Sequence, residues 1–283
     1  MTESIAIVGA GGRMGQWFTR YFMDHGLAVT VYDAENAVQQ EGVTVAQSLV
    51  GAILRVDYAL LCTPTRRTPE IIRLIAKEMR RGSYLIEISS QKSKTTSALS
   101  KVPAKINPVC LHPMFGPGAK SIENQNIVSI PIRNGKEELE IAKNLFDGAN
   151  FVTISANEHD KKMAMILGLT HLINLIFCSI ISKDDKTSLT EKMSGSTFRI
   201  QKMLAESVMT QSPELIETIV SNPEIHRFAD EFWKDIGRLL TAIQDNKSEE
   251  ITSYIKACQN RLSSDDISES YKKQMKMSSS VDL

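Results

Sequence analysis

The chain contains 283 residues, of which 42% are hydrophobic and 23% are charged, the composition of an ordinary globular protein with room for two domains. Lysine plus arginine and aspartate plus glutamate both number 33, so the formal net charge is zero. No global positive field favours nucleic acid or an anionic membrane, and an anionic ligand must therefore be held by local groups.

The cysteines and the apolar segments point to a cytoplasmic location. Four widely spaced cysteines form no CxxC or metal-ligand arrangement, and we expect them to be reduced: Cys62, Cys110, Cys178 and Cys258. The amino terminus enters a strand without a basic region, so no secretory signal is expected. The most apolar span, residues 167–181, contains His171 and Asn174 and is too short to cross a bilayer. We therefore expect a soluble protein with no metal, membrane or nucleic-acid partner.

The first half of the chain alternates between strand and helix patterns. Residues 4–8 form a continuous apolar run, typical of a parallel strand that is buried on both faces. Further strands are predicted over residues 28–32, 58–62, 84–88, 109–111, 127–130 and 151–154. Helices are predicted between them over residues 14–25, 69–80, 94–100 and 137–146. This alternation predicts an α/β fold with a Rossmann-type, doubly wound parallel sheet.

Beyond residue 155 the strand pattern stops. Helical periodicity continues over residues 158–181, 186–210, 212–221 and 224–261. We therefore predict an α/β domain over residues 1–156 and an all-helical domain over residues 157–262. Residues 263–283 are rich in Ser, Lys and Asp, and we expect them to form a poorly ordered tail.

A glycine-rich turn follows the first predicted strand and precedes a helix. The residues of this candidate cofactor-binding turn are Gly9, Ala10, Gly11, Gly12, Arg13, Met14 and Gly15. Glycines at such a turn let the backbone approach a pyrophosphate, which the helix amino terminus attracts. Either Ala10 takes the first glycine position of a G-x-G-x-x-G motif, or Gly9 and Gly11 lead a loop that is one residue longer. The alternative to a ligand site is a simple helix-start turn.

Asp33 ends the second predicted strand, about 20 residues beyond the turn, where a carboxylate accepts hydrogen bonds from an adenosine ribose. Glu35 follows two residues later, and two carboxylates here would repel a 2′-phosphate. The cofactor is therefore expected to be NAD and not NADP, unless Asp33 merely ends a strand. Thr63 and Pro64 end the next strand and should pass beside the nicotinamide, or form a simple turn.

His112 is the candidate catalytic residue. It follows the strand predicted over residues 109–111 and precedes Pro113-Met114-Phe115-Gly116-Pro117. Ligands of a doubly wound sheet bind beyond the carboxyl ends of its strands. An imidazole, with a usual pKa of about 6.5, can take the proton of an alcohol whose hydride goes to a dinucleotide. The alternative is a loop histidine that Pro113 holds in place.

This glycine turn, combined with the His-Pro-Met-Phe-Gly-Pro stretch, resembles the prephenate/arogenate dehydrogenase family of tyrosine biosynthesis, over roughly residues 4–245. The resemblance implies NAD-dependent oxidative decarboxylation of prephenate to 4-hydroxyphenylpyruvate, or of arogenate to tyrosine. Ser90 and Lys92 match the family's Asp-x-x-Ser-x-Lys motif, which implies a catalytic role for Ser90 beside His112, although a serine here could also cap the next helix. Glu87 stands where the family usually has aspartate, and its role is left open.

The resemblance also implies residues for substrate binding. In the family, the Glu158-His159-Asp160 stretch starts the long helix, and a histidine at the position of His171 reaches the substrate. An arginine at the position of Arg199 grips a substrate carboxylate, for which a guanidinium is suited. His171 could instead be a core residue, and Arg199 an ordinary surface arginine. The family also implies a homodimer that forms through the helical domains.

Two other functions are compatible with these features. A hydroxyacid dehydrogenase of similar plan would have a catalytic lysine where this chain has His171. A non-catalytic NAD-sensing protein would keep the fold without turnover. The sequence does not distinguish prephenate from arogenate as the substrate.

Overall fold

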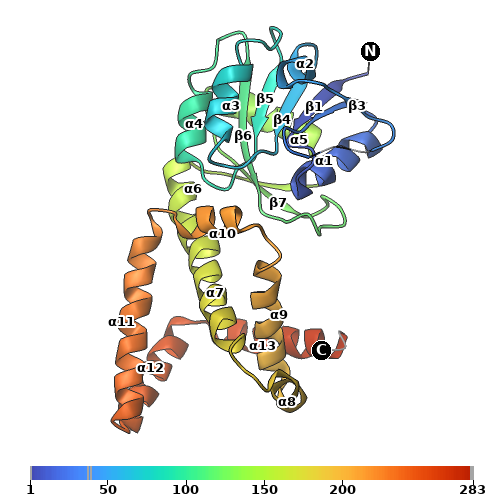
Figure 1. Cartoon of the computed structure of the whole chain (residues 1–283). Helices are drawn as coiled ribbons and strands as arrows, with labels where there is room; N and C mark the ends of the chain where they lie inside the picture. The colour runs from blue at the N-terminus through green and yellow to red at the C-terminus, as the bar shows by residue number, and fades with distance from the viewer. Residues whose placement is uncertain (1, 37, 39, 281–283) are drawn as a thin grey trace. The chain divides into compact units, whose positions relative to one another are not determined.

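The computed structural model describes residues 2–36, 38 and 40–280 and contains two compact units (Figure 1). The compact units of the structure divide between Met163 and Ala164, whereas the change of sequence pattern places the domain boundary after residue 156. The reason is local: Asp160, on the first turns of the long helix, accepts hydrogen bonds from the amides of Lys92 and Ser93 in the first unit. The first turns of this helix therefore belong to the α/β unit.

The first unit is built on one eight-stranded sheet with the order β3-β2-β1-β4-β5-β6-β7-β8. The strands are β1 (Ser4–Val8), β2 (Ala28–Tyr32), β3 (Thr44–Val45), β4 (Tyr58–Leu61), β5 (Tyr84–Glu87), β6 (Asn107–Pro113), β7 (Asn126–Ser129) and β8 (Asn150–Thr153). All neighbouring strands are parallel except β6 and β7. The chain joins these two through residues 114–125 without a helix, and a return without a crossover gives antiparallel pairing.

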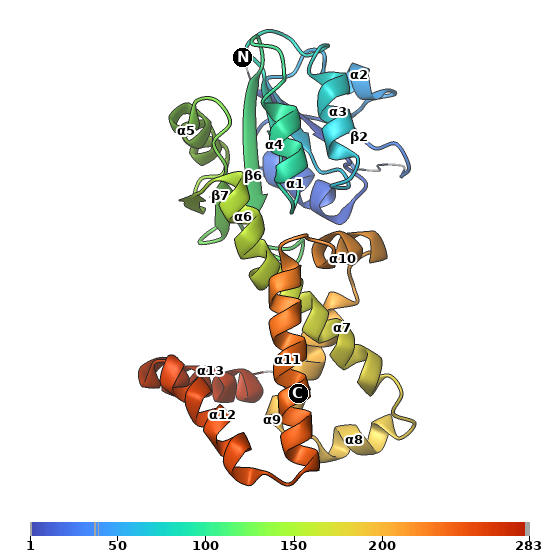
Figure 2. The ribbon, with the colours of Figure 1, turned by 90° about the vertical axis from the view of Figure 1, so that its left-hand side faces the viewer.

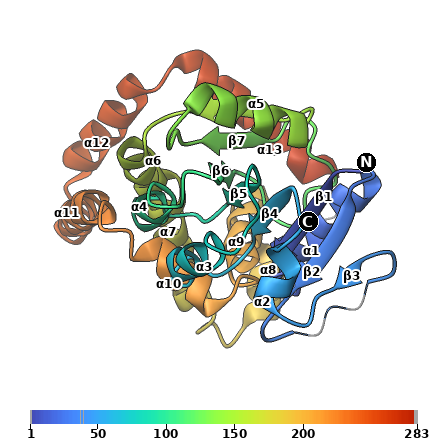
Figure 3. The ribbon, with the colours of Figure 1, turned by 90° about the horizontal axis from the view of Figure 1, so that it is seen from above.

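Helices cover both faces of this sheet (Figure 3). They are α1 (Arg13–Asp24), α2 (Leu49–Ile53), α3 (Thr68–Ile75), α4 (Ser93–Leu99), α5 (Gly135–Leu145) and α6 (Ala156–Met163). Alternate residues of β1 enter different cores: Ile5 and Ile7 pack with side chains of α1 and α5, whereas Ala6 and Val8 pack with those of α2, α3 and α4. This burial on both faces explains why the strands appear in the sequence as continuous apolar runs.

The register of the parallel strands places their carboxyl ends at one edge of the sheet. Val8 is paired with Leu61, Leu61 with Glu87, and Glu87 with Cys110. The residues that follow these strand ends therefore lie along the same edge. They include the glycine turn and His112.

The second unit is helical (Figure 2). Its helices are the π-helical turn η1 (Ala164–Leu169), α7 (Thr170–Ile181), α8 (Thr187–Met193), α9 (Ser196–Val208), α10 (Pro213–Val220), α11 (Ile225–Gln244), α12 (Ser248–Arg261) and α13 (Ser264–Ser280). The single helix expected over residues 224–261 is divided near Asn246, which adopts a positive φ of 54°. Such a left-handed residue ends a helix.

The carboxyl-terminal tail differs from the expectation of poor order. Residues Ser264–Ser280 form α13, and Gln274 Nε2 donates a 2.9 Å hydrogen bond to Thr197 Oγ1 on α9. Composition alone missed the local helix signals, which are the acidic residues Asp265 and Asp266 in the first turn and the lack of proline or glycine. Residues 281–283 of the expected tail lie outside the described residues.

The apolar span that was expected to be too short for a membrane is part of a longer helix. Residues Ala156–Ile181 form a helix of 26 residues, and an 18-residue window of it has a mean hydropathy of 2.1, enough to cross a membrane by length and composition alone. This helix nevertheless carries four buried polar side chains, those of His159, Asp160, His171 and Asn174. Each of them has hydrogen-bond partners within its own unit. These polar side chains are therefore satisfied, although only 22% of the most apolar window of the helix is buried within this chain.

Candidate functional site

The glycine turn is formed by close backbone approach at two positions. Gly9 has a φ of +86°, and a Cβ atom there would lie 2.6 Å from the carbonyl oxygen of Cys62. A Cβ atom at Gly15 would lie 2.1 Å from the carbonyl oxygen of Gly9, so α1 packs directly onto the turn. Gly9 therefore makes the tight turn and Gly15 the helix contact, which favours the longer loop over a motif that starts at Ala10.

Because the turn joins the end of β1 to α1, the amino terminus of α1 lies at the carboxyl edge of the sheet. Gly12 is the N-cap of this helix and Arg13 is its first residue, followed by Met14. A glycine N-cap supplies no side-chain acceptor for the first amides of the helix. These amides and the positive end of the helix dipole suit a phosphate group, so the turn fits a dinucleotide.

Asp33 lies against the same turn. Its Oδ2 accepts a 2.9 Å hydrogen bond from the amide of Gly11, and its Oδ1 accepts from the amides of Glu35 and Asn36. Burial alone would raise the pKa of Asp33, but these hydrogen bonds outweigh it and lower the pKa below its usual value. Asp33 is thus a fixed anion beside the turn. The Glu35 carboxylate is exposed and lies 3.8 Å from Arg67, a separation at which a surface ion pair contributes little.

Thr63 and Pro64 follow β4 at this edge. The Thr63 hydroxyl lies 2.9 Å from that of Thr68, and Thr68 Oγ1 also donates to the carbonyl of Pro64. These bonds tie the strand end to the first turn of α3. Thr63 and Pro64 thus form a strand-ending turn. Their contact with a cofactor stays a prediction.

His112 is buried on β6, with 5% of its surface exposed. Its Nδ1 atom lies 2.8 Å from Nε2 of His159, and Nδ1 of His159 lies 2.9 Å from Oδ1 of Asp160. Burial, followed by the positive charge of Lys92, lowers the pKa of His112 well below its usual 6.5, and Asp160 acts in the opposite direction. The imidazole is therefore neutral at pH 7 and can accept a proton.

A second buried network surrounds Glu87. Lys92 Nζ donates a 2.7 Å hydrogen bond to Glu87 Oε1 and also contacts the carbonyl of Leu111, the residue before His112. Glu87 further accepts hydrogen bonds from Ser89, Thr95 and Cys110. Glu87 and Lys92 are both fully buried. The role that the sequence left open for Glu87 is therefore to neutralise Lys92 and join β5, α4 and β6.

Ser90 is half-buried in the loop between β5 and α4. The serine that binds the local network is its neighbour Ser89, whose hydroxyl donates to Glu87. Ser90 occupies the same edge of the sheet as His112, and a catalytic contact between the two stays a prediction.

The two predicted substrate-binding residues lie in the helical unit. His171 is buried on α7, with Nδ1 2.8 Å from the carbonyl of Leu167 and Nε2 3.3 Å from Gln211 Oε1. Arg199 is half-buried in the first turn of α9, where its Nε donates a 3.0 Å hydrogen bond to Ser194 Oγ. These contacts hold both side chains in place within their unit, and contact with a substrate stays a prediction for each.

Sequence reasoning missed the importance of His159 and Asp160. The Glu158-His159-Asp160 stretch was noted only as the start of a helix, although a histidine directly before an acidic residue is a signal for an imidazole that the acid could orient. Among the described residues, no group of three or more His, Cys, Asp or Glu side chains is arranged to hold a metal ion.

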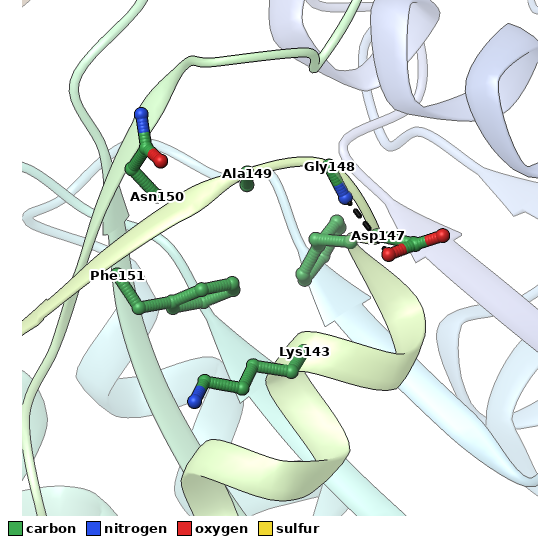
Figure 4. Close-up of a pocket in the computed structure, with 7 residues that line it drawn as sticks. Lys143, Asp147, Gly148, Ala149, Asn150 and Phe151 are labelled. Carbon is green, nitrogen blue, oxygen red and sulfur yellow. Dashed lines mark hydrogen bonds between the residues drawn. The ribbon is translucent and has the colours of Figure 1, made fainter.

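A pocket elsewhere in the first unit is separate from this site. Figure 4 shows it at the end of α5, where the amide of Gly148 donates a 3.0 Å hydrogen bond to Asp147 Oδ1. It is lined by Lys143, Phe146, Asp147, Gly148, Ala149, Asn150 and Phe151. None of these is a residue of the glycine turn or of the network around His112.

Comparisons with known proteins assign the chain to a family. The model of the prephenate dehydrogenase nucleotide-binding domain matches residues 18–155, and that of the prephenate dehydrogenase dimerization domain matches residues 155–257. The first match begins at residue 18, after the glycine turn of residues 9–15. The turn therefore supports a nucleotide-binding site independently of this match.

Individual relatives agree with these matches. The chain is 26% identical over 260 residues to a probable arogenate/prephenate dehydrogenase of Methanocaldococcus jannaschii, covering 87% of this chain and 58% of that protein. It is 26% identical over 180 residues to a 4-amino-4-deoxyprephenate dehydrogenase of Streptomyces pristinaespiralis, covering 60% of each chain. It therefore spans about three fifths of the length of these curated relatives.

The fold is also that of a solved member. The structure of prephenate dehydrogenase from A. aeolicus, in complex with hydroxyphenyl propionate and NAD+, matches with a TM-score of 0.72 at 19% identity, covering 92% of this chain and 97% of that one. Both domain types occur here in the family's order, a mostly parallel α/β sheet followed by a helical region. The chain belongs to the prephenate/arogenate dehydrogenase family.

Proposed function

We propose that this chain is an NAD-dependent dehydrogenase that oxidatively decarboxylates prephenate or arogenate. The observation that carries the proposal is His112, a buried neutral imidazole held at the same sheet edge as a dinucleotide-type glycine turn. Membership of the family supports the reaction class. It also disfavours the hydroxyacid dehydrogenase alternative.

The residues of the turn fit the cofactor. Gly9, Gly11 and Gly12 would admit the pyrophosphate to the amino terminus of α1, and Asp33 would accept hydrogen bonds from the adenosine ribose. Thr63 and Pro64 would border the nicotinamide half. When bound, NAD supplies the acceptor for the hydride that leaves the substrate ring carbon.

His112 would take the proton of the ring hydroxyl, converting the alcohol to a carbonyl as hydride departs. Ser90 would orient that hydroxyl or the imidazole. Loss of the ring carboxylate as CO₂ makes the ring aromatic, which drives the step forward. Arg199 would hold the side-chain carboxylate through its guanidinium, and His171 would contact the substrate from α7.

An assay of NAD reduction with each of the two substrates tests the proposal. Purified protein should produce the NADH absorbance band with prephenate, with arogenate or with both, and release CO₂ in equal amount. Absence of turnover with both substrates, at saturating NAD and with the protein shown to be folded, would favour the NAD-sensing alternative.

Cofactor preference provides a first prediction. NAD should be preferred over NADP by at least about tenfold in kcat/KM, because Asp33 and Glu35 both oppose a 2′-phosphate. Steady-state rates with each cofactor measure this preference. Asp33→Ser, combined with an arginine nearby, should reduce it, and equal use of the two cofactors by the unmodified protein would contradict the assignment.

Substrate anchoring provides a second prediction. Arg199→Ala should weaken substrate binding by about 2–4 kcal/mol, the cost of losing a charged hydrogen-bond partner, and leave NAD binding nearly unchanged. Equilibrium titrations with substrate and with NAD separate the two effects. Arg261→Ala, at an exposed arginine of α12, is the matched control. Unchanged substrate affinity in Arg199→Ala would return Arg199 to a structural role.

We further infer that the protein forms a homodimer through its helical unit. The matched family model is that of a dimerization domain. Large apolar side chains of this unit are exposed, among them Ile176 and Ile180 on α7 and Trp233 on α11. Burial of such side chains is the main driving force for association. Sedimentation equilibrium should give twice the chain mass of 31.5 kDa. A cytoplasmic location stays a prediction.

A further inference from the structure

Three side chains of the α/β unit form a hydrogen-bonded row behind the proposed base. His112 on β6 contacts His159 on α6 through Nδ1 and Nε2 at 2.8 Å, and His159 contacts Asp160 through Nδ1 and Oδ1 at 2.9 Å. His159 is fully buried, and Asp160 is 8% exposed. Because all three residues lie within one compact unit, the row is a property of that unit by itself.

The chemistry of the row determines which nitrogen carries each proton. Burial alone would raise the pKa of Asp160, but hydrogen bonds from His159, Ser93 and Lys92 lower it below its usual value. Asp160 is thus an anion that only accepts hydrogen bonds, so Nδ1 of His159 carries a proton. A neutral His159 then has a lone pair at Nε2, which must accept from Nδ1–H of His112. This leaves the lone pair of His112 on Nε2.

The reverse arrangement would place an additional positive charge in a crowded region. If Nε2 of His159 donated to His112, His159 would carry protons on both nitrogens and be a cation. Lys92, fully buried and in contact with the Leu111 carbonyl, already holds a positive charge near His112. Glu87 is engaged by that lysine at 2.7 Å, and Asp160 is shared with the amides of Lys92 and Ser93. A neutral His159 avoids the cost of a further buried charge.

We propose that His159 and Asp160 are positioning residues that hold His112 in the Nδ1–H tautomer, with Nε2 presented as the proton acceptor. When Nε2 takes the substrate's hydroxyl proton, the imidazolium keeps its Nδ1–H bond to His159, and the Asp160 carboxylate stabilises the new charge through that bond. One proton moves from the hydroxyl oxygen to the imidazole nitrogen, and the accompanying hydride would go to NAD, as in the proposed function. The inference rests on the proposed function only for the identity of the proton donor.

The primary test observes the tautomer directly and without substrate. Protein labelled with ¹⁵N-histidine is examined by long-range ¹H–¹⁵N correlation near pH 7, with the His112 signals assigned by their loss in His112→Asn. The expected spectrum has a protonated Nδ1 and an unprotonated Nε2 for His112, and the same pattern for His159. A protonated Nε2 on His112, or protons on both nitrogens of His159, would overturn the proposal.

Variants at His159 link the tautomer to the reaction. His159→Leu removes the acceptor, and we expect kcat to fall roughly 10- to 100-fold, as when other orienting partners are lost. The substrate KM and the NAD affinity should be nearly unchanged, and the His112 signals should shift toward the Nε2–H tautomer. His159→Gln, whose amide oxygen can accept from Nδ1–H, should restore most of the rate. Asp160 is left intact because it also caps α4 through Lys92 and Ser93.

The outcomes separate this inference from the proposed function. If His112 has the expected tautomer but neither prephenate nor arogenate is turned over, the positioning role stands and the proposed reaction fails. If turnover is normal while His159→Leu retains full kcat with an unchanged His112 spectrum, the reaction stands and the positioning role is wrong. Equal thermal unfolding of the leucine and glutamine variants ensures that a rate difference between them reflects the hydrogen bond and not folding.

Discussion

Replacing His112 with asparagine should reduce kcat by about 10²- to 10⁴-fold, the usual contribution of a positioned general base. Asparagine retains a hydrogen-bonding group of similar size but cannot accept the proton. NAD binding should be unaffected, because Asp33 is bound to the glycine turn through the amide of Gly11, whereas the His112 side chain is bound to His159. Steady-state kinetics and a fluorescence titration of NAD measure the two quantities, and His226→Asn, at an exposed histidine of α11, is the matched control.

The pH dependence of kcat/KM should identify the same residue. Activity requires neutral His112, so kcat/KM rises with pH through its pKa. An imidazole with the ordinary pKa of about 6.5 would place this rise around pH 6 to 7. In the structure, burial and then the charge of Lys92 lower the pKa of His112, with Asp160 acting in the opposite direction. The rise should therefore lie at a lower pH than an ordinary histidine would give.

The asparagine variant should lose this acidic limb, and its low residual rate should be nearly flat over the same range. Near-full activity with the limb retained would show that another group accepts the proton. His171 would be the first residue to test. Such a result would also weaken the role given to His112 in the proposed function.

The α/β fold could be predicted from sequence because strands that are buried on both faces appear as continuous apolar runs. The strand predicted over residues 28–32 coincides with β2, and the other predicted strands and helices of this unit differ from the observed ones mainly at their ends. The antiparallel direction of β7 could not be predicted, since a strand's direction depends on the path of its connection and not on its own residues. Likewise, two-residue β3 is too short to leave a pattern.

The candidate site was predicted only in part, because some of its residues meet only through tertiary packing. His112 and the glycine turn each sit beside a strand whose apolar run marks its position. His159 lies 47 residues from His112 in the chain, and their contact depends on how Asp160 ties α6 to the start of α4. Side-chain contacts of this kind follow from tertiary packing, which periodicity does not report.

Breaking the buried ion pair between Glu87 and Lys92 should have the largest effect on stability. Lys92→Met leaves the Glu87 carboxylate buried without its cationic partner, and loss of one member of such a pair typically costs about 3–5 kcal/mol. The matched control is Lys94→Met, at an exposed lysine of the same helix, which should change the free energy of unfolding by no more than about 0.5 kcal/mol.

The measurement must report on the α/β unit alone, because a two-unit chain need not unfold in one step. The chain has two tryptophans: Trp17 is buried in the core of the α/β unit, and Trp233 is exposed on α11. In a Trp233→Phe background, urea unfolding followed by fluorescence therefore observes the α/β unit through Trp17.

A double variant separates the ion pair from simple loss of packing. Glu87→Gln combined with Lys92→Met leaves no buried charge at this place, and its stability should exceed that expected from adding the two single effects. Such non-additivity is the mark of a direct interaction between the two side chains. If Lys92→Met were instead within about 1 kcal/mol of the parent, less than the cost of a broken buried pair, the network around Glu87 would not be what joins β5, α4 and β6. The position of His112, which follows the Leu111 carbonyl bound by Lys92, would then need another support.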